Sequence, residues 1–262
     1  MSGTKARAAT VVLAIGGHDP TGGAGIQADI EAIQAQGCTA VTLVTALTAQ
    51  NTTRVQACRP ADRDALVEQA RVLLDDVDID AIKIGLVPDT AIATAVAEIL
   101  DRLPKRPVVC DPVLAAGTGD ALARAGVAAA LIDRIAPRTT VMTPNVPEAL
   151  ALVPQAGSAE AAAAALIATG TQYVLLTGTH APTEEVENAL FERGGCRRRD
   201  CWQRLPGSFH GSGCTLAAAL AARLALGEDI DGAAHAAQRF TWNALARALR
   251  VGRGQLHPDR RA

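Results

Sequence analysis

Aromatic side chains are scarce in this sequence, with one Tyr, two Trp and three Phe among 262 residues, although 49% of the positions are hydrophobic. Long apolar runs are also missing, because Asp, Glu, Arg or Gln interrupts every alanine-rich stretch before it reaches the roughly 20 residues of a membrane helix. The N-terminal segment lacks the clear cleavage pattern of a signal peptide. We therefore expect a cytoplasmic protein with no membrane partner.

Charge of one sign is not in excess, since 25 Lys and Arg stand against 27 Asp and Glu. The chain lacks the clustered basic surface with which proteins bind nucleic acids, and the arginine run at residues 197–199 is expected in a solvated loop. The six cysteines contain no C-x-x-C pair, so free thiols are expected. A metal site at Cys196 and Cys201 is the alternative, but no histidine lies at zinc-finger spacing.

Short apolar segments alternate with longer alanine- and leucine-rich segments, which is typical of an α/β protein with a central, mostly parallel sheet flanked by helices on both faces. No linker or repeat divides the chain, so we expect one domain over residues 1–262. Residues 185–192 and 198–205 are expected to form a hairpin. The expected strands are residues 10–15, 39–45, 81–84, 108–110, 140–143 and 173–177, and the expected helices are residues 25–36, 61–74, 90–103, 121–135, 214–226 and 230–249.

The loop after the first expected strand holds five glycines in ten residues, reading GGHDPTGGAG over residues 16–25. Ligands of parallel sheets bind beyond the carboxyl ends of the strands, and the N–H groups at a helix N-terminus can bind an anion. The loop is not a P-loop, because Gly23 and Ala24 stand where Lys and Ser or Thr are required, and it lacks the G-x-G-x-x-G spacing of dinucleotide sites. A glycine-rich turn with only a packing role is the alternative.

A second candidate segment is HGSGC at residues 210–214, which runs directly into an apolar helix. The small residues would let consecutive N–H groups converge at the helix N-terminus, which is the geometry of an anion hole. The same position lowers a thiol pKa, so Cys214 is expected to be a thiolate or a strong polariser. A buried structural cysteine at a helix start is the alternative, and His210 is a weaker candidate for a base.

A third set of polar residues ends two neighbouring strands, with Asp111 after one strand and the segment TPNVPE at residues 143–148 after the next. Carboxylates and an amide at adjacent strand ends suit Mg²⁺, which takes oxygen ligands and keeps several waters near phosphates. Asp-Pro and Pro-Asn are also ordinary turn formers, so a structural role is the alternative.

Together these segments resemble one family. The pattern of the hydroxymethylpyrimidine/phosphomethylpyrimidine kinases of thiamine biosynthesis is followed, in order and over nearly the whole chain, by GGHDPTGGAGIQADIEA, TALTAQNT, KIGLV, VVCDPVLAAGTGDAL, MTPNVPEA, LLTGTH and LPGSFHGSGCTLAAALAA. The resemblance implies a ribokinase-like fold, and phosphorylation of 4-amino-5-hydroxymethyl-2-methylpyrimidine and then of its monophosphate with ATP and Mg²⁺. GSGC stands where the sugar kinases of that fold have GAGD, so Cys214 takes the place of their aspartate base.

The resemblance also implies roles for single residues. Those implied to line the pyrimidine pocket are Gly17, Asp29, Gln50, Leu86 and Val113. Those implied to carry phosphoryl transfer are Cys214, beside the substrate hydroxymethyl group, and Gly211, Ser212 and Gly213. Those implied to bind ATP are Asn145, Thr177 and Gly178, and those implied to organise Mg²⁺ are Asp111 and Glu148. Since few rings are available to stack on a pyrimidine or an adenine, recognition should rely on Gln50, Asp29 and backbone groups.

Two lysines of many relatives are missing. Gly117 stands in place of the lysine of a K-S-G-D flap, and Thr177 in place of the lysine of a K-G-G-H turn. Only Lys5, Lys83 and Lys105 remain, so Mg²⁺, backbone amides or an unassigned arginine must meet the phosphate charge. Loss of a charge-assisted hydrogen bond of this kind costs about 1 to 3 kcal/mol.

The sequence thus predicts a kinase that takes a small pyrimidine substrate. A pyridoxal or pyridoxine kinase is the nearest alternative, because it shares the fold and an aromatic alcohol substrate. A catalytically silent pyrimidine-binding protein is the alternative that the missing lysines suggest. The resemblance also makes a homodimer plausible, although nothing in the sequence pattern demands an interface.

Overall fold

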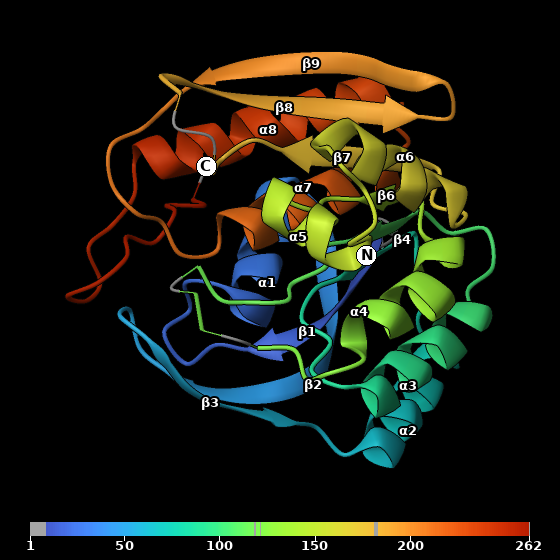
Figure 1. The fold of residues 1–262 in the computed structure, drawn as a ribbon. Coiled ribbons are helices and arrows are strands. Elements are labelled where there is room, and N and C mark those ends of the chain that lie inside the picture. The colour runs from blue at the N-terminus through green and yellow to red at the C-terminus, as the bar shows by residue number, and fades with distance from the viewer. Residues whose placement is uncertain (1–8, 118, 121, 181–182, 262) are drawn as a thin grey trace, which may run out of the picture.

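The computed structural model describes residues 9–117, 119–120, 122–180 and 183–261. These residues form a nine-stranded sheet with the order β3-β2-β1-β4-β5-β6-β7-β8-β9 (Figure 1). Neighbouring strands pair in parallel along the run β2-β1-β4-β5-β6-β7. Strand β3 pairs antiparallel with β2, and β8 pairs antiparallel with both β7 and β9. The strands are β1 (Val11–His18), β2 (Thr39–Gln50), β3 (Val55–Pro60), β4 (Ala81–Ile84), β5 (Val108–Cys110), β6 (Val141–Met142), β7 (Tyr173–Thr177), β8 (Glu185–Glu192) and β9 (Gly195–Gln203). The expected, mostly parallel sheet is confirmed.

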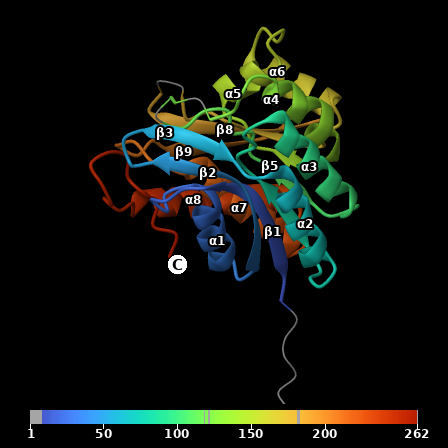
Figure 2. The ribbon, with the colours of Figure 1, turned by 90° about the horizontal axis from the view of Figure 1, so that it is seen from below.

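Helices cover both faces of the sheet (Figure 2). One apolar core lies between the sheet and α2, α3, α5 and α6, and a second lies between the sheet and α1, α7 and α8. The central strands are buried on both faces, which explains their nearly continuous apolar sequences. The helices are α1 (Gly25–Ala35), α2 (Arg63–Leu74), α3 (Thr90–Asp101), α4 (Val127–Ala130), α5 (Val146–Leu152), α6 (Ala159–Ala168), α7 (Ser212–Ala225) and α8 (Ile230–Ala246).

The alanine-rich helix α7 lies deepest in the second core. Residues 215–222 are all buried, and α7 packs against both α1 and α8. Alanine has no side chain beyond Cβ, so the helix can approach its neighbours closely while it keeps a high helix propensity. The alanines of α7 therefore allow close packing of a buried helix that starts at the HGSGC segment.

Two expectations about secondary structure are wrong. Strand β3 was not expected, because its sequence VQACRP mixes polar and apolar residues as an edge strand with a partly exposed surface does. The helix expected at residues 121–135 begins only at Val127, after Gly126 with φ +85°, and continues as a π-helical turn (Leu131–Ile135) and a 3-10 turn (Ala136–Arg138). Residue 121 lies outside the described residues.

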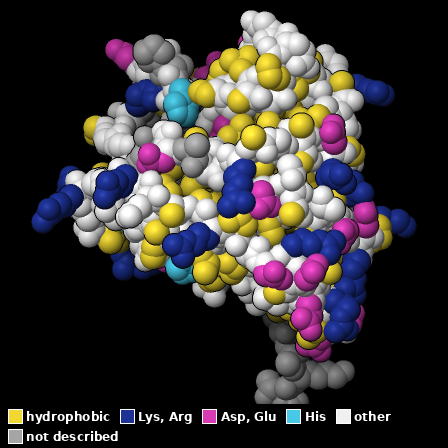
Figure 3. All heavy atoms as spheres, turned by 60° about the horizontal axis from the view of Figure 1, so that its bottom comes forward, with side chains coloured by type: hydrophobic (Ala, Val, Ile, Leu, Met, Phe, Trp, Pro, Cys, Tyr) yellow, Lys and Arg dark blue, Asp and Glu magenta, His cyan; other side chains and the backbone are white. Residues whose placement is uncertain are grey.

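The hairpin expected near residues 185–205 is confirmed as β8 and β9, although β9 starts earlier than expected and includes the arginine run. Arg197, Arg198 and Arg199 therefore lie in a strand and not in a loop, and each pairs with an acidic side chain. On the face drawn in Figure 3, acidic and basic side chains are interspersed. No helix among the described residues combines the length and the apolar character needed to cross a membrane.

Candidate active site

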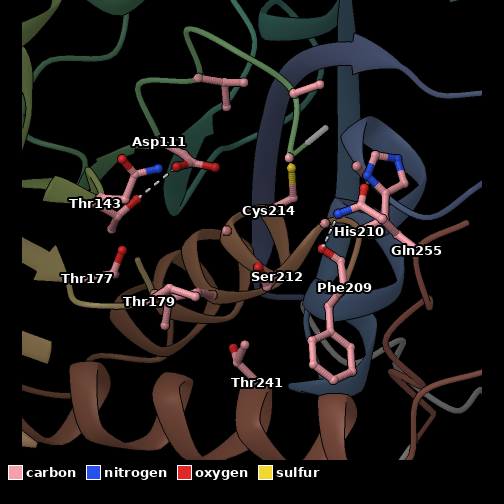
Figure 4. A pocket seen from close by; sticks show the side chains of 18 of the residues that line it. Asp111, Thr143, Thr177, Thr179, Phe209, His210, Ser212, Cys214, Thr241 and Gln255 are labelled. Carbon is pink, nitrogen blue, oxygen red and sulfur yellow. Dashed lines mark hydrogen bonds between the residues drawn. The ribbon is translucent and has the colours of Figure 1, made fainter. Parts of the chain in front are cut away.

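A cavity of about 740 Å³ lies at the carboxyl ends of the parallel strands and reaches the N-terminus of α7 (Figure 4). This is where a parallel α/β sheet is expected to bind ligands. Two residues predicted for the site, Asp29 and Gly178, do not line the cavity. Those that line it are Gly17, Gln50, Leu86, Asp111, Val113, Asn145, Glu148, Thr177, Gly211, Ser212, Gly213 and Cys214.

The N-terminus of α7 forms the loop that the sequence predicted as an anion hole. Gly211 precedes the helix with φ +80°, and a Cβ at this position would collide with the carbonyl oxygen of Gly23. Only glycine allows both this backbone conformation and this close approach. The N–H groups of residues 212–214 belong to the first helical turn, which offers them no carbonyl partner and leaves them directed toward the cavity end.

Cys214 lies in the first turn of α7, and the backbone N–H of Gly25, at the start of α1, acts to lower the pKa of its thiol. Burial nevertheless raises the pKa of this thiol to about 11, although Lys83 acts in the opposite direction. The expected lowering of the thiol pKa is therefore wrong, since desolvation outweighs the helix termini and the nearby ammonium group. Cys214 is a neutral thiol at neutral pH, which favours the polariser among its two expected roles.

Asp111 and Glu148 place two carboxyl groups in the cavity wall. Burial raises the pKa of Asp111 to about 6. Burial, followed by the negative charge of Asp111, raises the pKa of Glu148 to about 8. Thr143 donates to Asp111 Oδ1 at 3.4 Å, as Figure 4 shows. A Cβ placed on Gly213 would lie 3.3 Å from Asp111 Oδ2, so the carboxyl group faces the loop at the start of α7.

Asn145 and Glu148 also hold the start of α5. The Asn145 side chain accepts from the N–H of Glu148 at 2.8 Å, and Glu148 Oε2 accepts from the N–H of Asn145 at 3.0 Å. This reciprocal pair is a capping box, so both residues have a structural role at the start of α5. The cap uses Asn145 Oδ1 and Glu148 Oε2, while both residues also line the cavity.

Asp29 is fully buried and does not face the cavity, so its expected contact with a pyrimidine finds no support in the structure. It pairs with Lys83, whose Nζ lies 2.7 Å from Asp29 Oδ1, and Lys83 is itself 1% exposed. Lys83 lines the cavity floor, and burial alone would lower its pKa, but the negative charge of Asp29 raises it. Sequence reasoning missed this residue, although a lysine inside the apolar strand AIKI was a usable signal.

Gly178 is turned away from the cavity. Its N–H donates to Asn188 Oδ1 at 3.1 Å, and a Cβ at this position would collide with the carbonyl oxygen of Glu187 in β8. The close approach of β7 and β8 explains why this position is glycine. The Gly178 amide is therefore already bonded and is not offered to a triphosphate.

Among the predicted pyrimidine residues that line the cavity, Gly17 lies on β1, Gln50 on β2, Leu86 after β4 and Val113 after β5. Gln50 Nε2 donates to Thr48 Oγ1 at 2.9 Å, which fixes the orientation of the Gln50 amide beside the cavity. A Cβ at Gly17 would lie 2.8 Å from a methyl group of Leu86, so the absence of a side chain at Gly17 leaves room for Leu86 in the wall.

Aromatic side chains are concentrated in the cavity wall, although they are scarce in the sequence as a whole. Trp202, Trp242 and Phe209 all line it, and the indole N–H groups donate to Gln238 Oε1 and to the carbonyl of Gln203, both at 2.9 Å. Recognition through Gln50, Asp29 and backbone groups stays a prediction, but the cavity wall also offers three aromatic rings. These rings come from β9, from α8 and from the loop before α7, and only the fold brings them together.

The mostly parallel sheet and the open helix N-terminus that faces buried carboxyl groups define a kinase of the ribokinase-like fold. The family model described as Phosphomethylpyrimidine kinase matches residues 19–259. The chain is 37% identical over 256 residues to the hydroxymethylpyrimidine/phosphomethylpyrimidine kinase of Rhizobium meliloti, covering 94% of this chain and 96% of the relative. It is 39% identical to the Escherichia coli enzyme of the same name, covering 92% and 94%. The chain belongs to the phosphomethylpyrimidine kinase family, as the resemblance predicted.

Two solved structures show the same fold. The pyridoxal kinase from Staphylococcus aureus in complex with AMP-PCP and pyridoxal is 25% identical, with a TM-score of 0.87 over 97% of this chain and 95% of that one. The phosphomethylpyrimidine kinase from Clostridium difficile is 28% identical, with a TM-score of 0.77 over 90% of this chain and 99% of that one.

Proposed function

We propose that this kinase uses ATP to phosphorylate 4-amino-5-hydroxymethyl-2-methylpyrimidine and then its monophosphate. The observation that carries the proposal is the N-terminus of α7, where the first-turn N–H groups and Cys214 border the same cavity as Asp111 and Gln50. The names of the relatives from Rhizobium meliloti and Escherichia coli support the substrate, and the AMP-PCP bound by the staphylococcal structure supports ATP.

The first turn of α7 carries the transfer step in this proposal. Phosphoryl transfer depends mostly on positioning and electrostatic stabilisation, and the N–H groups of residues 212–214 would receive the charge of the transferred group. Cys214 is neutral, so it accepts a hydrogen bond from the substrate hydroxyl at sulfur and aligns the oxygen instead of removing its proton beforehand. The attacking oxygen of a loose transition state needs this alignment more than early deprotonation.

The cavity also fits Mg²⁺. The negative charge of Asp111 raises the cost of ionising Glu148, and a divalent cation beside them would relieve this repulsion. Among the described residues no group of three or more His, Cys, Asp and Glu side chains could hold a metal, so the ion would depend on waters and on nucleotide phosphates. When bound, Mg²⁺ would neutralise charge on those phosphates, and Asp111 and Glu148 would hold it.

The pyrimidine lies between β2 and the segments after β4 and β5 in this proposal. The Gln50 amide, oriented by Thr48, would meet the polar edge of the ring, while Leu86 and Val113 would cover its apolar surface. Lys83 would contribute a positive charge below the Cys214 sulfur that stabilises any negative charge formed there.

A direct assay tests this function. Purified protein with ATP and Mg²⁺ is expected to convert the pyrimidine alcohol to its diphosphate, with the monophosphate as an intermediate visible by chromatography. Failure to phosphorylate either compound would show that the proposed function is wrong.

The likeness to the staphylococcal pyridoxal kinase favours pyridoxal as a second candidate substrate, because that structure covers nearly the whole chain. The two alcohols are compared side by side with the same enzyme preparation. We expect kcat/KM for the pyrimidine alcohol to exceed that for pyridoxal by at least tenfold, and the reverse order would assign the chain to pyridoxal phosphorylation.

A further inference from the structure

The segment after α8 returns to the loop that precedes α7. The N–H of Leu256 donates to the carbonyl of Ser208 at 2.8 Å, and its carbonyl accepts from the N–H of His210 at 2.8 Å. Further along, the N–H of Asp259 donates to the carbonyl of Ala244 in α8 at 2.9 Å. The segment is therefore fixed both to the loop before α7 and to α8.

Arg260, the next residue of this segment, is a buried cation. Its side chain is 1% exposed, and the described lining of the cavity does not include it. Its Nη1 donates to Oε2 of Glu31 in α1 at 3.0 Å, so an exposed carboxylate balances its charge. A guanidinium that is buried away from water also needs hydrogen-bond acceptors for its other N–H groups.

These acceptors belong to the two loops that meet at the start of α7. Nη2 of Arg260 donates to the carbonyl of Gly23 in the glycine-rich loop, and its Nε donates to Oγ1 of Thr215 in α7 at 2.8 Å. Oγ1 of Thr215 in turn donates to the carbonyl of Gly211 at 2.8 Å. One side chain thus joins the glycine-rich loop to the first turn of α7.

The two loops are in close contact at the point where Arg260 joins them. A Cβ at Gly211 would collide with the carbonyl oxygen of Gly23, and this is the oxygen that accepts from Arg260. A shift of the Gly23 carbonyl therefore displaces Gly211, and with it the N–H groups of residues 212–214. Arg260 can act on these groups without a contact to substrate.

We propose that Arg260 is a positioning residue, which holds the glycine-rich loop and the first turn of α7 so that the N–H groups of residues 212–214 face the cavity. The proposal rests on the proposed function for the role of these groups in phosphoryl transfer. Since they would receive charge that develops in the transition state, their displacement should lower kcat and leave substrate binding nearly unchanged.

Steady-state kinetics with ATP and the pyrimidine alcohol test the proposal on Arg260→Met and Arg260→Lys. Arg260→Met removes every donor, and we expect kcat to fall at least tenfold while KM for both substrates stays within threefold. Arg260→Lys keeps the charge and part of the hydrogen bonding, so it should recover part of the lost kcat. A kcat of Arg260→Met within twofold of the wild type, or a loss carried by KM alone, would overturn the proposal.

Arg261→Gln is the matched control for the charge. Arg261 is the next residue of the same segment, its side chain is 76% exposed, and it pairs with Asp259. Its replacement should leave kcat and both KM values within twofold of the wild type.

Thr215→Val covers the case in which Arg260→Met does not fold. The variant keeps the shape of the side chain and cuts only the link from Arg260 to Gly211, so kcat should fall at least threefold, and an unchanged kcat would overturn the proposal. Thr171→Val is its control, because the buried Thr171 hydroxyl donates to the carbonyl of Ala136 at 3.1 Å, apart from the described cavity lining, and its loss should leave kcat within twofold.

Hydrogen exchange separates this proposal from the function on which it rests. The N–H groups of His210 and Thr215 are bonded to the carbonyls of Leu256 and Gly211, so their exchange measures the order of the loop without any substrate. Peptides that cover residues 209–216 should exchange at least tenfold faster in Arg260→Met than in the wild type. Faster exchange in a protein whose wild type does not phosphorylate the pyrimidine alcohol would support the positioning role and overturn the proposed function. Unchanged exchange with an active wild type would overturn the positioning role alone.

Discussion

Nε2 of His210 lies 2.8 Å from Oδ2 of Asp19, and the two residues are 191 positions apart in the chain. The contact joins the glycine-rich loop after β1 to the loop before α7. Asp19 also accepts from the N–H groups of Thr21 and Ala24, so one carboxylate organises the start of both loops. Burial works to raise the pKa of Asp19, but the hydrogen bond from His210 and those from the two N–H groups lower it to about 2.

This contact predicts an acid-sensitive contribution to stability. The folded pKa of Asp19 lies below the unfolded value near 4, so the stabilisation is complete above about pH 4 and is lost as the pH falls toward about 2. Asp19→Asn should cost about 1 to 2 kcal/mol of unfolding free energy at pH 7 and roughly half as much at pH 3. Urea denaturation at both pH values measures this difference. Asp76→Asn, at an exposed position, is the control and should show no such dependence.

The buried pair of Lys83 and Asp29 predicts a strong non-additivity. Lys83→Met leaves the Asp29 carboxylate buried without its partner, which should cost about 3 to 5 kcal/mol of unfolding free energy. The double variant Lys83→Met with Asp29→Leu removes both charges and should recover more than half of that loss. Chemical denaturation of the two single variants and the double variant gives the coupling energy. Additive effects would mean that the two charges do not stabilise each other.

The sequence predicted the architecture well because short, nearly continuous apolar strands alternate with longer helices along the chain. Twelve of the fourteen predicted site residues line the cavity, since glycine loops and polar residues at strand ends follow the connections of a parallel sheet. The sequence could not predict the direction of the Asp29 side chain or the Gly178 amide, because both depend on packing against elements distant in sequence. The predicted lowering of the Cys214 thiol pKa was wrong for a similar reason. Desolvation depends on the whole fold, whereas the helix start that suggested the lowering is a local feature of the sequence.

Cys214 should therefore resist alkylation at neutral pH. A thiol with a pKa of about 11 is almost fully protonated at pH 7, and only the thiolate reacts readily with iodoacetamide. Peptide mapping by mass spectrometry should show Cys196 and Cys201, which are exposed, modified well before Cys214. Rapid modification of Cys214 at pH 7 would instead support a thiolate in the free enzyme.

Removal of the thiol should nevertheless impair the reaction. Cys214→Ala is expected to lower kcat about 10²-fold, the scale of a lost polar contact to a reacting group, while KM for ATP changes less than threefold. Steady-state kinetics with the pyrimidine alcohol measure both parameters, and Cys201→Ala at an exposed site serves as the control. Turnover of Cys214→Ala within threefold of the wild type would reduce the residue to a packing role.

Variants of the two glycines that flank α7 distinguish the effect of backbone strain from the effect of a displaced site loop. Gly211 and Gly227 both have positive φ, +80° and +85°, but a Cβ at Gly227 would meet open space, whereas one at Gly211 would collide with Gly23. Gly227→Ala should therefore cost about 1 kcal/mol of stability and leave kcat unchanged. Gly211→Ala should cost about 2 to 3 kcal/mol and also lower kcat more than 10²-fold, because it displaces the N–H groups that we propose receive the phosphoryl group. Thermal denaturation and kinetics on both variants test this, and equal kcat values would show that the loop at the start of α7 does not take part in the transfer.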